Sequence, residues 1–444
     1  MQMSSEYSKS SVDSIYQFAK LLTGKSLNEV SQIPIDAGNI KSRGNLGSLV
    51  ERYFFKHLPP NTHHPDFEEV GLELKTTGLV RDSKGKLKAK ERLVLTMIHY
   101  ESIAKEEWES SNLLQKCQLM LILFYLYQKD KPAVDLKFPI SPLLYRMPEI
   151  DVPIIRRDWE FIRQRVLDGR AHELSEGDTF YLGACRKGSG GEDESLQNQP
   201  FSNTKAKTRA FSFKQSYMNK LIEGHIEESG IIQLGTSDSL YEATFEKLEP
   251  FLGKTLDEIS RSVDYYRTST NQKGFKHSLI VRLLSNGRKT APELDKAGIE
   301  IKTITLTQSG KPKEHMSFPG FRFMDIIQQE WEDSSFNEKI ERKFLFVVFK
   351  LDEIGEERLF RFGYWNMPYK DRLEAQRVWE ETKRRVLIDA KDLPKVGESY
   401  LAHVRPKARD GSDKIRTPQG EMHLKQCFWL NQNYLHKLVF EELS

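Results

Sequence analysis

The chain repeats itself, and this duplication limits its possible folds more than any other feature. The segment PDFEEVGLELKTT at residues 65–77 reappears as PELDKAGIEIKTI at residues 292–304. Four other landmarks recur in the same order, roughly 220 to 230 residues later. They are GKSLNEV (24–30) with GKTLDEI (253–259), EWE (107–109) with EWE (330–332), WE (159–160) with WE (379–380), and YL (181–182) with YL (400–401). Ordered matches at nearly constant spacing indicate a duplicated domain, because chance echoes within one long domain would not keep their order.

A duplication of this length predicts two domains, at residues 1–230 and 240–444. The 444 residues exceed one ordinary domain, and a hydrophobic content of 38% is enough for two cores. The stretch EESGIIQLGTSDS at 227–239 has the Gly and Ser that are typical of a linker. The formal net charge of +3 argues against a histone-like nucleic-acid binder, although a basic groove is compatible with a balanced total.

Several protein classes receive little support from the sequence. Cys117, Cys185 and Cys427 are too few and too scattered for a disulfide framework or a zinc cluster, which favours a reduced, cytoplasmic setting. The purest apolar run, Leu119 to Tyr127, is far shorter than the ~20 residues of a membrane-spanning helix. The start MQMSSEYSKSS does not resemble a secretory signal. We find no Walker loop, GxGxxG or G-x-S-x-G motif, so we do not expect a kinase, an NTPase or a serine hydrolase.

Each copy is predicted to be α/β, with a mixed β-sheet flanked by helices. Short runs rich in Leu, Val, Ile and Tyr indicate strands, and longer segments with helical spacing indicate helices. In the first copy the expected helices are 12–22, 46–55 and 156–167, and the expected strands are 71–76, 92–99 and 119–127.

The sharpest candidate site is formed by Asp66, Glu73 and Lys75. Glu73 and Lys75 alternate within a predicted strand, so their side chains share one face. Two carboxylates at the start of a strand can hold a hard cation such as Mg²⁺, and a nearby lysine can orient water or stabilise developing charge. This is the arrangement of a metal-dependent nuclease. The alternative is a cross-strand ion pair on a sheet surface, and the residues alone leave both interpretations open.

Two further residues are candidates for the same cluster. Glu51 lies on the predicted helix 46–55 and could supply a third carboxylate; alone it would be read as an exposed helical glutamate. Lys116 follows the first EWE motif by several residues and precedes the apolar strand; alone it would be read as a residue that flanks a strand.

A basic segment follows later in the first copy. Lysine and arginine alternate there with Phe211, Phe213 and Tyr217, a pattern that suits a groove along DNA phosphates. A solvated amphipathic segment is the alternative interpretation. The candidate DNA-binding residues are Arg186, Lys187, Lys205, Lys207, Arg209 and Lys214.

Taken together, these motifs resemble a known family. RGNLGSLVERYF, PDFEEVGLELKTT and EEWESSNLLQK are similar to the MutH mismatch-repair endonucleases. The whole chain, with AHELSEG, KAKTRAFSFK and the second copy, more closely resembles the Sau-type restriction endonucleases that cut at GATC. The resemblance implies a catalytic triplet at Asp66, Glu73 and Lys75, an additional acidic residue at Glu51, a lysine near the scissile phosphate at Lys116, and a DNA contact at Lys187.

The second copy departs from this pattern. Glu293 stands where the first copy has Asp66, and Val281 stands where it has Glu51, although Glu300 and Lys302 remain. Valine offers no oxygen to a metal ion. The resemblance therefore implies a degenerate C-terminal domain that binds DNA and regulates without cutting, so that the two tandem MutH-like domains form a pseudo-dimer.

The function implied is that of a type II restriction endonuclease. It would recognise double-stranded 5′-GATC and hydrolyse the phosphodiester bond 5′ of the G with Mg²⁺, as a cytoplasmic enzyme without a membrane partner. Each chain has one intact site, whereas a palindromic target has two equivalent strands to cut. We therefore expect a monomer in solution that binds two DNA copies or assembles on DNA. The alternatives are a mismatch-repair nickase acting at GATC and a GATC-binding regulator that does not cleave.

Overall fold

The computed structural model describes residues 7–31, 46–57, 64–187, 196–227, 240–269, 272 and 274–443. These residues form two compact units. The first contains the described residues up to His172, together with 181–187 and 196–227. The second contains the described residues from Leu240 onward and the short segment Glu173–Phe180. The expected linker at 227–239 lies almost entirely outside the described residues, so the domain boundary remains a prediction.

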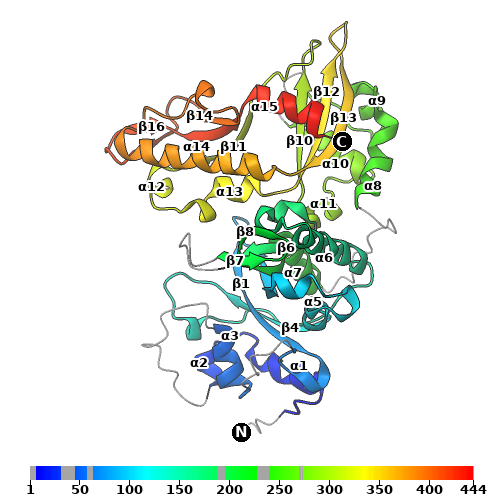
Figure 1. The fold of residues 1–444 in the computed structure, drawn as a ribbon, viewed down its shortest axis with the longest axis vertical. Coiled ribbons are helices and arrows are strands. Elements are labelled where there is room, and N and C mark those ends of the chain that lie inside the picture. The colour runs from blue at the N-terminus through cyan, green and yellow to red at the C-terminus, as the bar shows by residue number, and fades with distance from the viewer. Residues whose placement is uncertain are drawn as a thin grey trace. The chain divides into compact units, whose positions relative to one another are not determined.

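The first unit is α/β, as predicted (Figure 1). Its helices are α1 (Val12–Ala19), α2 (Leu27–Val30), α3 (Leu46–Leu49), α4 (Tyr100–Ile103), α5 (Asn112–Cys117), α6 (Val152–Leu167) and α7 (Gln215–Glu227). Its strands are β1 (Glu73–Arg81), β2 (Leu87–Ala89), β3 (Leu93–Ile98), β4 (Leu119–Leu126), β5 (Leu143–Arg146), β6 (Leu182–Arg186), β7 (Leu196–Gln199), β8 (Ser202–Lys207) and β9 (Arg209–Phe213).

Strand β4 is the centre of the first sheet, whose order is β2-β1-β4-β5. Its sequence LMLILFYL has no polar alternation, because all but its last residue are buried. Strand β1 pairs with it in parallel, and the register sets Glu73 opposite Met120 and Lys75 opposite Ile122. A smaller antiparallel sheet, in the order β3-β9-β6, completes the unit together with the hairpin β7-β8.

The second unit repeats this plan (Figure 1). A parallel pair, β10 and β12, is extended by β13, and a second sheet has the order β11-β17-β14. Its helices are α8 (Leu240–Leu248), α9 (Leu256–Ser262), α10 (Phe275–Leu284), α11 (Pro292–Ala297), α12 (Phe323–Ile326), α13 (Ser335–Ile340), α14 (Tyr369–Ile388) and α15 (Gln432–Lys437). Its strands are β10 (Glu300–Leu306), β11 (Met316–Phe321), β12 (Phe344–Leu351), β13 (Glu357–Trp365), β14 (Ala402–Pro406), β15 (Lys414–Arg416), β16 (Met422–Leu424) and β17 (Gln426–Leu430).

The repeated tryptophans are buried in the core of each unit, where they pack in pairs. The rings of Trp108 and Trp159 lie 5.8 Å apart between centroids, at an interplanar angle of 62°. The rings of Trp331 and Trp379 also lie 5.8 Å apart, at 57°. Contacts of this kind between buried aromatic rings are favourable, so each pair helps to pack the core of its unit.

The repeated GKSLNEV and GKTLDEI motifs form the same local structure. Ser26 caps α2 in a capping box with Glu29, and Thr255 caps α9 in a capping box with Glu258. In a capping box the two residues satisfy each other's backbone donors at the helix start. The duplication read from the sequence is therefore a duplication of fold.

The expected secondary structure agrees with the described residues in type, with differences in the bounds. The expected helix 156–167 begins earlier, at Val152, and the expected helix 12–22 is α-helical to Ala19 and ends in a 3-10 turn. The expected strand 71–76 begins at Glu73 and extends to Arg81. The expected helix 46–55 is α-helical only to Leu49 and continues as a π-helix over Val50–Phe54. Short π-helical segments are rare and frequently occur at functional sites. In the described part of the chain, we find no helix that is both long and apolar enough to cross a membrane.

Candidate active site

Glu73 is the buried centre of the candidate site. It begins β1 and is only 2% exposed. Its Oε1 accepts a hydrogen bond from Lys75 Nζ at 2.6 Å, and Lys116 Nζ lies 3.7 Å from the same oxygen. Its Oε2 is buried and has no hydrogen-bond partner among the described residues. A buried carboxylate oxygen without a partner is costly, so this atom is suited to a ligand.

Asp66 lies beside Glu73 because the chain turns back on itself before β1. The amides of Phe67 and Leu72 each donate to the carbonyl of the other, at 2.9 and 3.2 Å, and Gly71 adopts a left-handed φ of +63° within this turn. The turn brings Leu74 N within 2.8 Å of Asp66 Oδ2. Burial and the neighbouring Glu73 carboxylate raise the pKa of Asp66. A bound cation would stabilise the ionised form of this carboxyl group.

Glu51 lies on the π-helical segment and faces the same cluster. Burial is the main cause of its raised pKa, and the charge of Asp66 adds to it. Nevertheless, no group of three or more His, Cys, Asp or Glu side chains among the described residues is arranged to hold a metal ion. Glu51 is thus an electrostatic neighbour of Asp66 and Glu73 in this structure.

Lys116 reaches the site from a helix. It lies in the last turn of α5, which Ser111 caps at its N-terminus, and β4 begins three residues after it, at Leu119. The position of α5 therefore places the Lys116 ammonium group near Glu73. The alternative interpretation, a residue that only flanks a strand, does not account for this contact.

The residues at the site fit a divalent cation. Asp66 and Glu73 supply carboxylate oxygens, and the unpartnered Oε2 of Glu73 is available for one. Mg²⁺ is commonly bound through one or two carboxylates, with substrate phosphate and water completing its shell. Two carboxylates beside two lysines satisfy that requirement without a third protein ligand.

The structure does not bring the six predicted DNA-binding residues onto one exposed surface. Lys205 on β8 is exposed, and Arg186, Lys187 and Lys207 are half-buried. Arg209 and Lys214 are 4% and 6% exposed. The interleaved residues Phe211, Phe213 and Tyr217 are core residues and cannot stack on bases in this structure.

The equivalent place in the second unit has a different charge balance. Glu300 Oε1 lies 2.7 Å from Lys302 Nζ, and its Oε2 is also buried without a partner in the described residues. Burial and the charges of Arg342 and Lys302 lower the pKa of Lys339. Val281 is buried on α10, and Glu293 lies in the first turn of α11 rather than in an extended segment before the strand.

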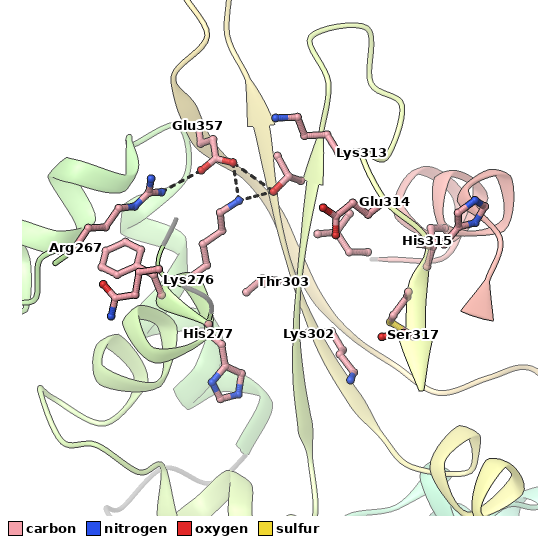
Figure 2. Close-up of a pocket in the computed structure, with 17 residues that line it drawn as sticks. Arg267, Lys276, His277, Lys302, Thr303, Lys313, Glu314, His315, Ser317 and Glu357 are labelled. Atoms are coloured by element: carbon pink, nitrogen blue, oxygen red, sulfur yellow. Dashed lines mark hydrogen bonds and ion pairs between the residues drawn. The ribbon is translucent and has the colours of Figure 1, made fainter. Parts of the chain in front are cut away.

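A cavity of about 630 Å³ adjoins β10 in the second unit. Figure 2 shows Arg267 and Lys276 directed toward Glu357 at one side of this cavity. Lys276 Nζ lies 2.5 Å from Glu357 Oε1, and Arg267 Nη2 lies 3.3 Å from Glu357 Oε2. Lys302, Lys313 and His315 also line the cavity, so its wall is rich in cations.

Comparisons with known proteins show the family to which the chain belongs. The family model for the DNA mismatch repair enzyme MutH matches residues 55–158 and 283–372, one segment in each copy. The type II restriction enzyme Sau3AI of Staphylococcus aureus is 32% identical to the chain, over 96% of this chain and 97% of its own length. The MutH proteins of Shewanella woodyi and Serratia proteamaculans are 27% and 25% identical, over 39% and 48% of this chain and 74% and 92% of their own lengths. Because the likeness to Sau3AI covers both copies, the chain belongs to the family of type II restriction enzymes that includes Sau3AI, and it is built from two tandem MutH-like domains.

Proposed function

We propose that this enzyme recognises double-stranded 5′-GATC and hydrolyses the phosphodiester bond 5′ of the G with Mg²⁺. The observation that carries the proposal is the buried carboxylate of Glu73: its Oε1 pairs with Lys75 and Lys116, its Oε2 has no partner in the described residues, and its charge acts on Asp66. GATC is the target implied by the resemblance to the Sau-type enzymes. We place the protein in the cytoplasm, where it would meet DNA.

Each residue of the site has a distinct task in this proposal. When bound, Mg²⁺ would supply Lewis-acid stabilisation of the charge that develops on the phosphate. Asp66 and Glu73 hold the cation. Lys75 orients the attacking water and can accept or return its proton. Lys116 stabilises negative charge on the scissile phosphate. Glu51 adds negative charge, which favours binding of the cation.

Burial divides the basic residues into two groups. We assign phosphate contacts to the exposed side chain of Lys205 and to the half-buried side chains of Arg186, Lys187 and Lys207. Arg209 donates from Nη1 to Ala184 O at 2.5 Å, which ties β9 to β6. We assign Arg209, and the similarly buried Lys214, to support of this sheet, so that they contribute to DNA binding only through the strands they stabilise.

The second unit is proposed to bind DNA without cutting it. In the first unit Glu51, Asp66 and Glu73 face two lysines, which favours a cation. In the second unit Glu300 faces Lys302 and Lys339, so its surroundings favour a phosphate. We propose a monomer in solution whose two units engage two DNA copies, or which assembles on DNA. Sedimentation with and without a GATC duplex tests this; a stable dimer of the free protein would contradict it.

The nickase alternative receives less support. The MutH relatives match less than half of this chain, whereas Sau3AI matches it almost completely. A non-cleaving regulator is disfavoured because Lys75 and Lys116 both contact the buried Glu73 carboxylate, and Asp66 lies close enough to feel its charge.

Digestion of plasmid DNA tests the proposed function. Unmethylated, adenine-methylated and hemimethylated plasmids are incubated with Mg²⁺ or with a chelator, and the ends are sequenced. We expect Mg²⁺-dependent double-strand cuts 5′ of G at GATC. Nicks restricted to hemimethylated DNA would favour the repair enzyme, and specific binding without cleavage would favour the regulator.

A further inference from the structure

His57 connects the two segments that carry the acidic residues of the site. Its backbone N donates to Glu51 O at 2.9 Å, which closes the end of the π-helical segment. Its ring Nε2 lies 2.6 Å from Asp66 O. The ring also stacks on Phe67, with centroids 4.7 Å apart and planes at 11°. One residue is thus bonded to the chain at Glu51 and at Asp66.

The backbone before His57 is bent to make this connection. Lys56 has a φ of +48°, in the left-handed region that a side chain normally disfavours. A left-handed residue just after a helix lets the next amide turn back to a carbonyl one turn earlier. Strained backbone that persists in a fold is concentrated at functional sites. Here it directs the His57 ring toward Asp66.

The partners of the ring also determine which nitrogen carries the proton. A carbonyl oxygen only accepts, so His57 Nε2 must donate to Asp66 O. An ammonium group only donates, and Lys9 Nζ lies 3.3 Å from His57 Nδ1, so Nδ1 accepts. Lys9 also donates to Lys56 O at 3.3 Å. These contacts orient the ring so that Nε2 donates to Asp66 O.

The remaining support of Asp66 is limited. Asp66 belongs to no helix or strand, and Leu74 N holds one oxygen of its carboxylate. The hydrogen bond from His57 fixes the carbonyl group of Asp66, and the stacking of the His57 ring on Phe67 fixes the residue that follows Asp66. Together they set the position from which the Asp66 carboxylate faces Glu73.

We propose that His57, oriented by Lys9, is a positioning residue that holds Asp66 for cation binding. This inference rests on the proposed function, because it concerns the cation that Asp66 and Glu73 would hold. Groups that orient a metal ligand typically contribute 10- to 100-fold to metal affinity or activity. We expect the His57 contact to contribute at the lower end of that range, since it acts on the backbone of the ligand.

Three substitutions in the full chain separate the hydrogen bond from the packing. His57→Phe keeps a ring that can stack on Phe67 but removes Nε2. His57→Gln loses the ring but places an amide N–H near the position of Nε2. Lys9→Met removes the donor to Nδ1. His64→Gln, at an exposed position before Asp66, is the matched control.

The readouts are calorimetric titration with Ca²⁺ on the DNA-bound protein, the Mg²⁺ concentration that gives half-maximal cleavage, and the thermal midpoint Tm. We expect His57→Phe to weaken Ca²⁺ binding and raise the Mg²⁺ midpoint by about tenfold, with a Tm close to that of the wild type. At saturating Mg²⁺ most of the cleavage rate should return. His57→Gln should stay within about threefold of wild type, Lys9→Met should lie between, and His64→Gln should not change.

Two results would overturn the proposal. One is a His57→Phe variant with wild-type Ca²⁺ binding and Mg²⁺ midpoint. The other is an equal loss in His57→Phe and His57→Gln that follows their Tm, which would assign His57 to packing alone. Failure of the proposed function looks different, because the wild-type protein itself would then neither bind Ca²⁺ at this site nor cleave. If His57→Phe does not fold, Lys9→Met is compared with wild type instead. Weaker Ca²⁺ binding and a higher Mg²⁺ midpoint in Lys9→Met would then support the proposal, and unchanged values would overturn it.

Discussion

Glu73 and Glu300 occupy the same position in the two units. Each begins the strand that pairs in parallel with the central apolar strand, opposite Met120 and Phe344 respectively. Each Oε1 accepts from the lysine two residues later, and each Oε2 is buried without a partner in the described chain. Their side chains differ in exposure, 3% for Glu73 and 32% for Glu300. The duplication has thus kept the glutamate, and in the first unit the charge of Glu73 also acts on the carboxyl groups of Asp66 and Glu51.

Removal of Asp66 should separate cleavage from binding. Asp66→Ala eliminates one of the two proposed cation ligands, and the loss of several kcal/mol of transition-state stabilisation corresponds to a rate reduction of about 10³-fold or more. The affinity for a GATC duplex in Ca²⁺ or chelator should change little, because the phosphate contacts lie elsewhere. Single-turnover cleavage and a binding titration check both parts; cutting at the wild-type rate would refute the site assignment.

The two lysines that pair with these glutamates should not be equivalent. Lys75→Met should reduce the rate of cleavage by about 10²- to 10⁴-fold, the usual contribution of a positioned proton-transfer group. Lys302→Met is the matched control in the second unit and should leave the single-turnover rate intact, although DNA affinity can fall. Rates measured at saturating enzyme distinguish the two; a similar loss of rate in both variants would contradict the assignment of the chemistry to the first unit.

The metal-free protein should be stabilised by neutralising Asp66. Burial and Glu73 raise the pKa of Asp66 in the folded state. The folded protein therefore binds this proton more tightly than the unfolded chain, and stability falls as the pH rises from the ordinary aspartate pKa through the raised one. At neutral pH, in chelator, Asp66→Asn should have a higher Tm than wild type, and the difference should shrink as the pH approaches 4.

Asp82 provides the opposite case for the same thermal scans. Backbone amides of Lys84 and Lys86 lower the pKa of Asp82. Asp82→Asn should therefore not raise the Tm at neutral pH. A decrease in Tm for Asp66→Asn at neutral pH in chelator would show that ionised Asp66 does not destabilise the metal-free protein.

Lys205 and Arg209 should affect different properties. Lys205→Ala should weaken binding to GATC and unrelated duplexes alike, and reduce the slope of log affinity against log salt by about 1. Arg209→Ala should instead lower the stability by about 1–3 kcal/mol, because the Ala184 carbonyl loses its buried donor. Salt-dependent binding and chemical denaturation test the pair. An unchanged salt slope in Lys205→Ala would remove this residue from the interface.

The sequence predicted the features that depend on local pattern. The apolar run of β4, the alternation of Glu73 and Lys75, and the repeated capping motifs each determine a local structure directly. The fold class and the two tandem copies followed from them. The position of Asp66 beside Glu73 required only the short turn that joins the two residues.

Other features depend on contacts that pattern does not reveal. The burial of Arg209 and Lys214 follows from the pairing of β9 between β3 and β6, which are distant in sequence. Alternation with aromatic residues was interpreted as an exposed groove, but the aromatic side chains form the core. The role of His57 was also missed, because a lone histidine after a helix carries no signal until its ring meets Asp66.

The most direct test of the account compares Glu73→Gln with Glu300→Gln on unmethylated plasmid DNA in Mg²⁺. Both substitutions keep the size of the side chain and remove its charge from equivalent positions. On this plasmid, and on short duplexes with one GATC site, we predict that Glu73→Gln does not cut, while Glu300→Gln cuts the short duplexes at the wild-type single-turnover rate. Cleavage by Glu73→Gln, or its loss in Glu300→Gln alone, would contradict the placement of the catalytic centre in the first unit.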